Sequence, residues 1–84
     1  MPIEFADEAW QDDLYWQKND RAILRRINHL LREVECSPFS GIGKPEPLKH
    51  HLGGYWSRRI DDTHRHVYRF QDQAVSVAQC RYHY

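Results

Sequence analysis

Residues 55–80 read YWSRRIDDTHRHVYRFQDQAVSVAQC, and this stretch decides the expected fold. It contains three runs in which the side-chain character alternates, separated by the polar turn sequences Asp61-Asp62-Thr63 and Gln71-Asp72-Gln73. A period of two is typical of strands, because successive side chains point to opposite faces of a sheet. The stretch therefore predicts three consecutive antiparallel strands.

A fourth strand is expected just before this stretch. Gly53-Gly54 separates PLKHHL, residues 47–52, from YWSRRI, and a Gly-Gly pair between two such runs is typical of a two-residue hairpin. The four runs together predict an antiparallel meander. Neither set of alternate residues in these strands is purely apolar, so the sequence does not decide which face of the sheet is buried. A β-bulge near the end of the last run would change the face on which His83 lies.

The first half of the chain has helical periodicity. An apolar stripe at three- and four-residue spacing predicts a helix over about 21–35, with the members Ile23, Leu24, Ile27, Leu30, Leu31 and Val34. A weaker pattern predicts a helix over 7–18, and Asn19-Asp20 separates the two helices and is suited to cap the second. Residues 2–5 alternate and predict a short strand, whereas the Pro- and Gly-rich residues 37–47 predict a surface loop. The order βααββββ indicates an α+β fold with two N-terminal helices packed on a mainly antiparallel sheet.

Length and composition exclude several classes of protein. With 84 residues the chain is expected to be a single domain, residues 1–84. Hydrophobic residues make up 40% and charged residues 29%, which argues against general disorder. The sequence has no signal peptide and no apolar run near 18 residues, so we expect a cytoplasmic protein without a membrane span. Cys36 and Cys80 have no metal-ligand spacing and are expected to be reduced thiols.

The charge is distributed unevenly along the chain. The formal net charge is zero, but residues 1–40 carry eight acids and five bases, whereas residues 41–84 carry four acids and seven bases. Five of the six histidines also lie in the second half. A basic, histidine-rich half on a neutral protein indicates a local anionic partner.

The second half contains the side chains needed to cut RNA without a metal. Pro45 and Pro47 restrict the backbone around the carboxylate of Glu46. Histidine changes its charge near neutral pH, which suits His83 to proton transfer. Four cations are placed to approach a phosphate, and two tyrosines to stack on a base: Lys49, Arg59, Arg65 and Arg81, and Tyr82 and Tyr84.

Each of these residues also has a structural interpretation. Glu46 can be an ordinary solvated loop residue, and Arg58, Arg59 and Arg65 a charged outer face of the sheet. His50-His51 and His64-x-His66 suggest a metal site, but no carboxylate or cysteine spacing supports it, so we expect no metal and no cofactor. The Trp10/Trp16 pair is more typical of a core or an interface than of a ligand site.

Three stretches together resemble the YoeB toxin family, within the wider RelE/ParE superfamily. These are DEAWQDDLYWQ at 7–17, KPEPLKHHLGGYWSRRIDDTHRHVY at 44–68 and CRYHY at 80–84. The resemblance runs through nearly the whole chain. It departs at His66, where relatives mostly have an apolar residue, and in the neutral net charge, since a ribosome-binding toxin benefits from positive charge.

The resemblance implies a RelE-like fold and a bacterial toxin of a type II toxin–antitoxin pair. Such a toxin is a ribosome-dependent endoribonuclease that cleaves mRNA in the A site, leaving a 2′,3′-cyclic phosphate and a 5′-OH. Matched by motif, Glu46 resembles the general base, His83 the general acid, Arg65 the residue that stabilises phosphate charge and Tyr84 the aromatic that orients the substrate. Lys49 and Arg59 resemble supporting cations.

The resemblance also implies partners. A YefM-like antitoxin of the Phd group is expected to fold on the toxin, cover the residues that end the chain and carry the complex to operator DNA, where it acts in autorepression. A homodimer is expected as well. The alternative is a ParE-like toxin without nuclease activity, which shares the fold and inhibits a protein target by binding. The presence of Glu46, Arg65, His83 and Tyr84 argues against that alternative.

Overall fold

The computed structural model describes residues 2–82 and has the expected α+β architecture. The elements are β1 (Ile3–Phe5), α1 (Asp7–Asn19), α2 (Arg21–Cys36), β2 (Glu46–Pro47), the 3-10 helix η1 (His50–Leu52), β3 (Trp56–Arg59), β4 (Arg65–Gln71) and β5 (Ala74–Gln79). The sheet order is β1-β5-β4-β3-β2. The three pairs from β2 to β5 are antiparallel and β1 pairs with β5 in parallel, which confirms a mainly antiparallel sheet.

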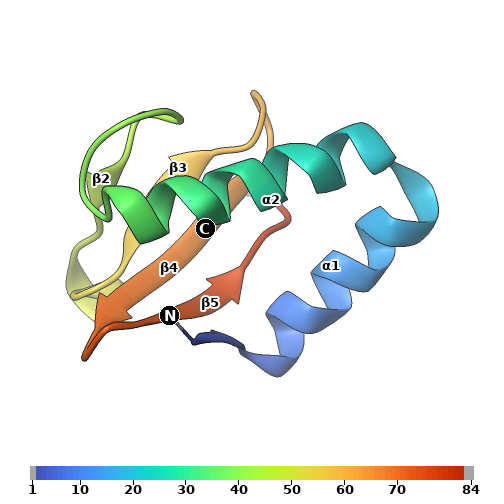
Figure 1. The fold of residues 1–84 in the computed structure, drawn as a ribbon. Coiled ribbons are helices and arrows are strands. Elements are labelled where there is room, and N and C mark those ends of the chain that lie inside the picture. The colour runs from blue at the N-terminus through green and yellow to red at the C-terminus, as the bar shows by residue number, and fades with distance from the viewer. Residues whose placement is uncertain (1, 83–84) are drawn as a thin grey trace.

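Both predicted helices are confirmed. Asp20 separates them and caps α2, because its carboxylate accepts the backbone N–H groups of Ala22 at 3.1 Å and Ile23 at 3.2 Å. α2 crosses one face of the sheet in front of β4, and α1 lies beside β5 (Figure 1). None of the helices in the described part of the chain is long and apolar enough to span a bilayer.

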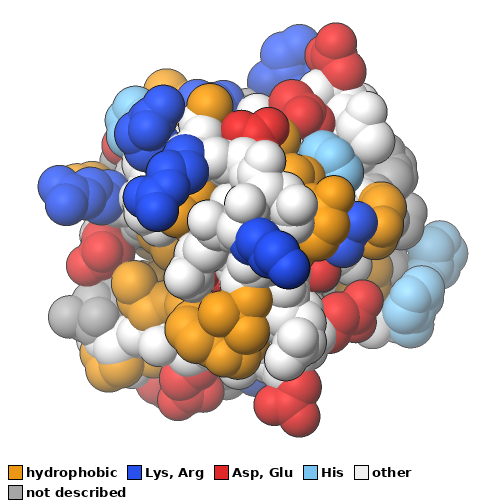
Figure 2. Space-filling model, turned by 90° about the vertical axis from the view of Figure 1, so that its right-hand side faces the viewer, with side chains coloured by type: hydrophobic (Ala, Val, Ile, Leu, Met, Phe, Trp, Pro, Cys, Tyr) orange, Lys and Arg blue, Asp and Glu red, His pale blue; other side chains and the backbone are white. Residues whose placement is uncertain are grey.

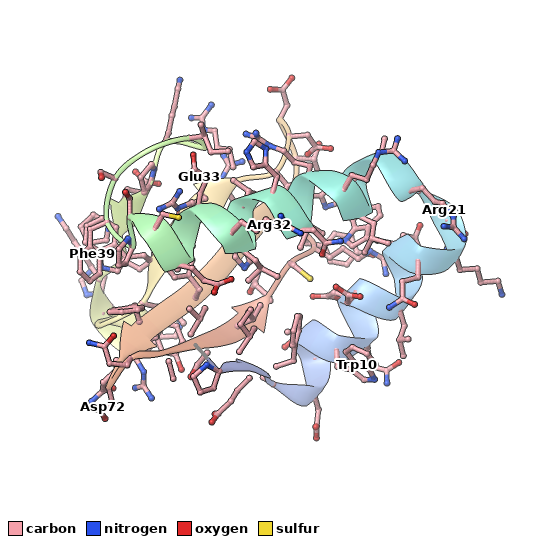
Figure 3. The ribbon with its side chains drawn as sticks, in the orientation of Figure 1. Trp10, Arg21, Arg32, Glu33, Phe39 and Asp72 are labelled. Atoms are coloured by element: carbon pink, nitrogen blue, oxygen red, sulfur yellow. The ribbon has the colours of Figure 1, made fainter. Side chains whose placement is uncertain are left out.

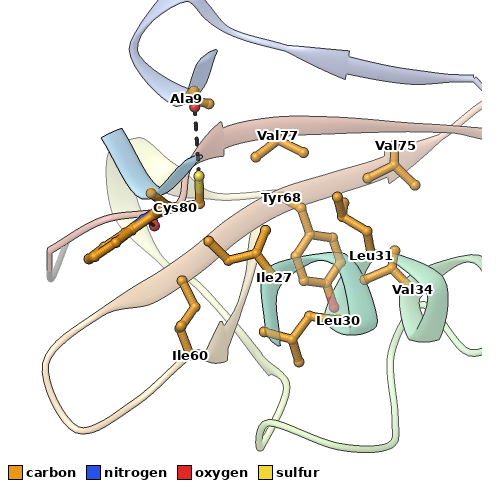
Figure 4. Close-up of a cluster of buried hydrophobic side chains, with 11 residues drawn as sticks. Ala9, Ile27, Leu30, Leu31, Val34, Ile60, Tyr68, Val75, Val77 and Cys80 are labelled. Carbon is orange, nitrogen blue, oxygen red and sulfur yellow. Dashed lines mark hydrogen bonds between the residues drawn. The ribbon is translucent and has the colours of Figure 1, made fainter. Parts of the chain in front are cut away.

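The core lies between the helices and one face of the sheet. Figure 4 shows the apolar stripe of α2, with Ile27, Leu30 and Val34, packed against Tyr68 of β4 and Val75 of β5. These side chains are fully or almost fully buried. The stripe predicted from sequence is therefore the core face of α2, and burial of this kind is the main favourable contribution to folding.

The expected strand over residues 47–52 is wrong beyond Pro47. After Leu48, which still donates its N–H to Tyr55 O at 2.9 Å, the chain turns into η1. His50 has a left-handed backbone with a φ of 59°, and the Gly53 N–H bonds back to its carbonyl at 2.9 Å. A left-handed residue ends extended pairing, so the link from β2 to β3 is a compact turn.

A bulge in β5 assigns the two faces of the sheet. Val67 lies opposite Gln79 but its neighbour Tyr68 lies opposite Val77, which leaves Ala78 as an extra residue on β5. Tyr68 and Val77 face the core, so Val67 and Gln79 share the outer face. Simple alternation would place Val77 and Gln79 on one face, and the bulge puts them on opposite faces.

Candidate active site

Two of the four cations predicted from sequence share the outer face of the sheet with the predicted carboxylate. Residues directly opposite one another in neighbouring strands share a face. Glu46 of β2 lies opposite Ser57 of β3, which lies opposite Val67 of β4. Arg59 lies opposite Arg65 on the same parity as Ser57 and Val67. Three strands thus bring one carboxylate and two guanidinium groups to one face.

The pair of arginines is electrostatically unfavourable by itself. Like charges directly opposite one another in a sheet repel. Arg65 is nevertheless 9% exposed, and its guanidinium donates to the carbonyls of Asp61 at 3.1 Å and His64 at 3.4 Å. Its position is therefore fixed by the turn that precedes β4. A buried, oriented guanidinium opposite a second one is suited to an anion such as a phosphate.

The turn before Arg65 is closed by Asp61. Its carboxylate accepts the N–H groups of Thr63 at 2.8 Å and His64 at 2.7 Å, which is the geometry of an Asx turn. The Asp-Asp-Thr sequence predicted a turn here, and this prediction is confirmed.

The loop that delivers Glu46 is anchored by Arg58, a residue that sequence reasoning placed on an outer charged face. Arg58 is fully buried instead. Its guanidinium donates to the carbonyls of Ile42 at 3.2 Å, Ser37 at 2.5 Å and Ser40 at 2.9 Å, and its Nε donates to the Tyr68 hydroxyl at 3.1 Å. The loop between α2 and β2 is therefore tied to the core side of β3. The sequence contained one weak signal that Arg58 is buried: it alternates in step with the apolar residues Trp56 and Ile60.

Lys49 lies next to Glu46 along a surface hollow. The hollow has a volume of about 540 Å³ and is lined by residues 46–52, including His50 and His51. All three cationic or titratable side chains, Lys49, His50 and His51, are exposed. The hollow therefore has both a carboxylate, Glu46, and a cation, Lys49, among its lining residues.

Arg81 lies elsewhere. Its guanidinium carbon is 3.4 Å from the centroid of the Tyr15 ring and 4.4 Å from that of Tyr82, and it lines a second hollow along α1. Figure 2 shows the side of the molecule on which Figure 1 draws α1, and acidic, basic and hydrophobic side chains are interspersed there. The structure therefore does not group Arg81 with Glu46, Arg59 and Arg65.

The chain after β5 is held by α1. The Asp12 carboxylate accepts the Cys80 N–H at 3.1 Å, and the Trp16 indole donates to the Cys80 carbonyl at 2.8 Å. Figure 4 shows Cys80 beside Ala9, whose carbonyl accepts from the thiol at 3.6 Å. Burial raises the pKa of the Cys80 thiol above its usual range, and burial also raises the pKa of the Asp12 carboxyl, although the bond from Cys80 opposes that shift.

Tyr82, two residues after Cys80, contacts the turn that precedes β4. Tyr82 donates its N–H to His64 Nδ1 at 2.7 Å and accepts the Arg65 N–H at 2.9 Å. Two of the predicted catalytic residues, His83 and Tyr84, lie outside the described residues. Sequence reasoning missed Asp12, Trp16 and His64 as supports of this segment. The i, i+4 spacing of Asp12 and Trp16 was a usable signal, because it places both on one helix face.

His66 is a buried histidine on the core face of β4. It is fully buried, stacks on Tyr68 with ring centroids 5.3 Å apart, and neither ring nitrogen has a hydrogen-bond partner. Burial, with a smaller contribution from the Arg58 charge, lowers its pKa to about 3. His66 is therefore neutral and does not belong to the outer face. Within residues 2–82 no group of three or more His, Cys, Asp or Glu side chains has metal-site geometry.

The chain is similar to known proteins over its whole length. The family described as YoeB-like toxin of bacterial type II toxin-antitoxin system matches residues 5–84. The chain belongs to the YoeB toxin family. Toxin YoeB of Escherichia coli K12 is 50% identical over 84 residues, which cover all of both chains.

Solved structures extend the likeness to the fold. The YoeB/ParE toxin from Agrobacterium tumefaciens matches with a TM-score of 0.98 and 45% identity over the whole of both chains. A heterotetrameric YoeB–YefM complex and a YoeB dimer from Staphylococcus aureus each match with a TM-score of 0.94 and 44% identity, over 100% of this chain and 98% of theirs. The expected RelE-like fold is confirmed, and this YoeB-family chain is a toxin of the type II class.

Proposed function

We propose that this toxin is a ribosome-dependent endoribonuclease that cleaves mRNA in the A site. The observation that carries the proposal is the outer face on which Arg65 lies opposite Arg59, in the same sheet as Glu46. A pair of guanidinium groups, of which that of Arg65 is held by the turn before β4, suits the charge that builds on a phosphate during transfer. A carboxylate on the same face suits the removal of a proton from the ribose 2′-OH.

The reaction needs two proton transfers. Glu46 takes the proton of the 2′-OH, and the 2′-oxygen forms a bond to the adjacent phosphorus. The bond from phosphorus to the 5′-oxygen of the next nucleotide breaks, and His83 gives that oxygen a proton. The products are a 2′,3′-cyclic phosphate and a 5′-OH, with Glu46 protonated and His83 neutral until they exchange protons with solvent.

The remaining residues assist this step. Arg65 and Arg59 contact the non-bridging phosphate oxygens, Lys49 approaches the phosphate from the hollow along residues 46–52, and Tyr84 stacks on the base so that the 2′-oxygen lies in line. Arg81 was predicted to bind phosphate as well. Its stacking on Tyr15 favours a role outside the reacting phosphate.

We also propose partners by analogy with the relatives. The S. aureus complex contains a YefM antitoxin, and a YefM-type antitoxin is the expected partner of this chain, through which it reaches operator DNA. The S. aureus dimer favours a homodimer. We propose that residues 1–84 act as one toxin domain in the bacterial cytoplasm.

The test uses ribosomes programmed with a defined mRNA and an empty A site. One reaction contains ribosomes, a second the same mRNA without them, and a third uses Arg65→Ala on ribosomes, with product ends mapped chemically. We expect cleavage on ribosomes with 5′-OH ends, and a loss of at least about 100-fold in Arg65→Ala, as for removal of a group that stabilises transition-state charge. Cleavage of free mRNA at the same rate would remove the ribosome from the proposal. No cleavage by folded protein would overturn it in favour of a ParE-like toxin that binds a protein target.

A further inference from the structure

The segment Cys80–Tyr82, here called the tail segment, follows the end of β5 and is held by hydrogen bonds from α1, from His64 and from the first residue of β4. β5 ends at Gln79, and the polar backbone groups of Cys80 bond to Asp12 and Trp16 of α1. Those of Tyr82 bond to His64 and Arg65. The segment is thus fixed at both of its ends by hydrogen bonds from other elements.

Tyr82 has a backbone conformation that needs such support. Its φ is 65°, in the left-handed region that bulky residues rarely occupy. Residues held in this region cost about 1–3 kcal/mol and persist where the surroundings determine them. The bonds to His64 and Arg65 lie on the two sides of Tyr82, and together they hold the peptide groups that flank it.

His64 is the side chain in this arrangement that touches both α1 and the tail segment. Its ring packs edge-on against Trp16, with centroids 4.8 Å apart, and lies 5.9 Å from the Tyr82 ring. Its Nδ1 receives the N–H of Tyr82 at 2.7 Å, so Nδ1 carries the lone pair. The next residue, Arg65, is the proposed phosphate-binding residue, so one turn holds both this cation and the backbone of Tyr82.

We propose that His64 is a positioning residue for the cleavage reaction. Its Nδ1 holds the N–H of Tyr82, whose carbonyl accepts the backbone N–H of Arg65, so His64 sets the position of the Tyr82 backbone beside Arg65. The inference rests on the proposed function, because it assigns His64 a part in that same reaction. It predicts that the acceptor atom of His64 matters for the rate of the chemical step, and that its ring matters mainly for packing.

Two variants separate the acceptor from the ring. His64→Phe keeps a ring against Trp16 and Tyr82 but has no acceptor. His64→Asn lacks the ring but has an amide oxygen near the position of Nδ1. His29, an exposed histidine of α2, supplies the matched control His29→Asn. Thermal unfolding measures the stability of each variant.

The measurement is single-turnover cleavage on programmed ribosomes, over a range of toxin concentrations. We expect His64→Phe to be at least about tenfold slower at saturation, which corresponds to about 1.4 kcal/mol in the barrier, with an unchanged half-saturating concentration. His64→Asn should recover most of the rate, even where it unfolds at a lower temperature. Exchange of the Tyr82 amide hydrogen, followed by NMR without ribosomes, should be slow in wild type and His64→Asn and faster in His64→Phe.

Three outcomes are decisive. Wild type that cuts, with His64→Phe cutting equally fast, overturns the positioning role and leaves the proposed function standing. A His64→Asn protein as slow as His64→Phe, with both losses following thermal stability, also overturns it, because the histidine would then act through packing alone. Wild type that does not cut on ribosomes overturns the proposed function and this inference together, whatever the amide exchange shows.

Discussion

At the scale of the residue, Arg58 shows how a cation is accommodated in a small core. Its guanidinium and Nε donate to three carbonyls and one hydroxyl, and the Tyr68 hydroxyl in turn donates to the Pro38 carbonyl at 2.7 Å. Burial of a charge is costly unless it is hydrogen-bonded in this way. The network ties the loop before Glu46 to β3 and β4.

We expect Arg58→Met to lower the free energy of unfolding by about 3 kcal/mol or more, because it leaves several buried acceptors without donors. The matched control is Arg59→Met, at the exposed neighbouring position. Urea unfolding of the two variants and wild type gives the comparison. A loss in Arg58→Met no larger than that in Arg59→Met would contradict the role given to the network.

His66 makes stability depend on pH. Its pKa falls from 6.5 to about 3 on folding, mainly through burial. Because the folded-state value lies below the unfolded value, the contribution is complete above pH 6.5 and is lost as pH falls toward 3. At pH 5 the loss is about 2 kcal/mol by this linkage.

His66→Leu should remove this dependence and also the two unsatisfied nitrogens. We expect wild type to lose about 2 kcal/mol more than His66→Leu between pH 7 and pH 5, measured by urea unfolding at each pH. His29→Leu, an exposed control, should follow wild type. Equal losses in wild type and His66→Leu would show that His66 is solvated or paired.

The sequence pattern indicated which residues share a face better than it indicated which face is buried. The motif positions Glu46, Arg59 and Arg65 do share a face of the sheet. Arg58 and His66 were missed as buried residues, because alternation alone cannot say which parity faces the helices when both contain charged or polar side chains. Arg58 is buried because it finds hydrogen-bond partners 16 to 21 residues away in the sequence. Such distant partners cannot be recognised from a single sequence.

At the scale of the element, the loop between α2 and β2 depends on Gly43. Its φ is 84°, and a Cβ there would lie 3.0 Å from Leu30 Cδ2 and 3.1 Å from Arg58 Cβ. The Gly43 carbonyl also accepts the Arg59 N–H at 2.6 Å. Backbone conformation and close packing both require glycine at this position.

Gly43→Ala and Gly54→Ala form a matched pair. Gly54 has a φ of 92° but open space around its Cα, so its alanine variant carries backbone strain alone. We expect a loss of roughly 1 kcal/mol for Gly54→Ala and at least about 2 kcal/mol for Gly43→Ala, from thermal or urea unfolding. Equal losses would mean that the loop adjusts to the added methyl group and is held less tightly than described.

The turn between β4 and β5 offers a way to raise the stability of the fold. Asp72 and Gln73 have φ values of 54° and 62°, and Asp72 lies at the tip of this turn (Figure 3). Two consecutive left-handed residues are typical of a type I′ turn, for which Asn-Gly is preferred. The double variant Asp72→Asn, Gln73→Gly should raise the free energy of unfolding by about 0.5–1 kcal/mol without a change in cleavage. A decrease would contradict the assigned turn.

Elements with a regular side-chain pattern were predictable, including the three-residue β1, but β2 and η1 were not. The apolar stripe of α2 and the polar breaks around β4 are repeated signals within one element. β2 has two residues, and η1 follows from local hydrogen bonds after His50, so neither leaves a periodic pattern. The bulge at Ala78 depends on the pairing of β4 with β5, a property of two strands together.

At the scale of the whole molecule, the proposed active site draws on segments far apart in the chain. β2, β3 and β4 supply the described residues of the outer face. The tail segment follows β5, on the other side of β4 in the sheet, and α1 holds it there. Trp10 and Leu14 of α1 remain 47% and 38% exposed, and Trp10 projects outward from the helix in Figure 3. The family motifs indicated the residues of the face. Only the fold shows that α1 is connected to them, because it holds the tail segment whose Tyr82 bonds to Arg65.

The most direct test of the account is cleavage by the chain shortened to residues 1–82. This variant keeps the bonds of Tyr82 to His64 and Arg65 and removes His83 and Tyr84. Circular dichroism and thermal unfolding first establish that it folds like wild type, and cleavage is then followed on programmed ribosomes. The account predicts an unchanged fold and loss of cleavage. A folded 1–82 chain that cuts mRNA at the wild-type rate would contradict it, since the proton donor and the stacking ring would then lie elsewhere.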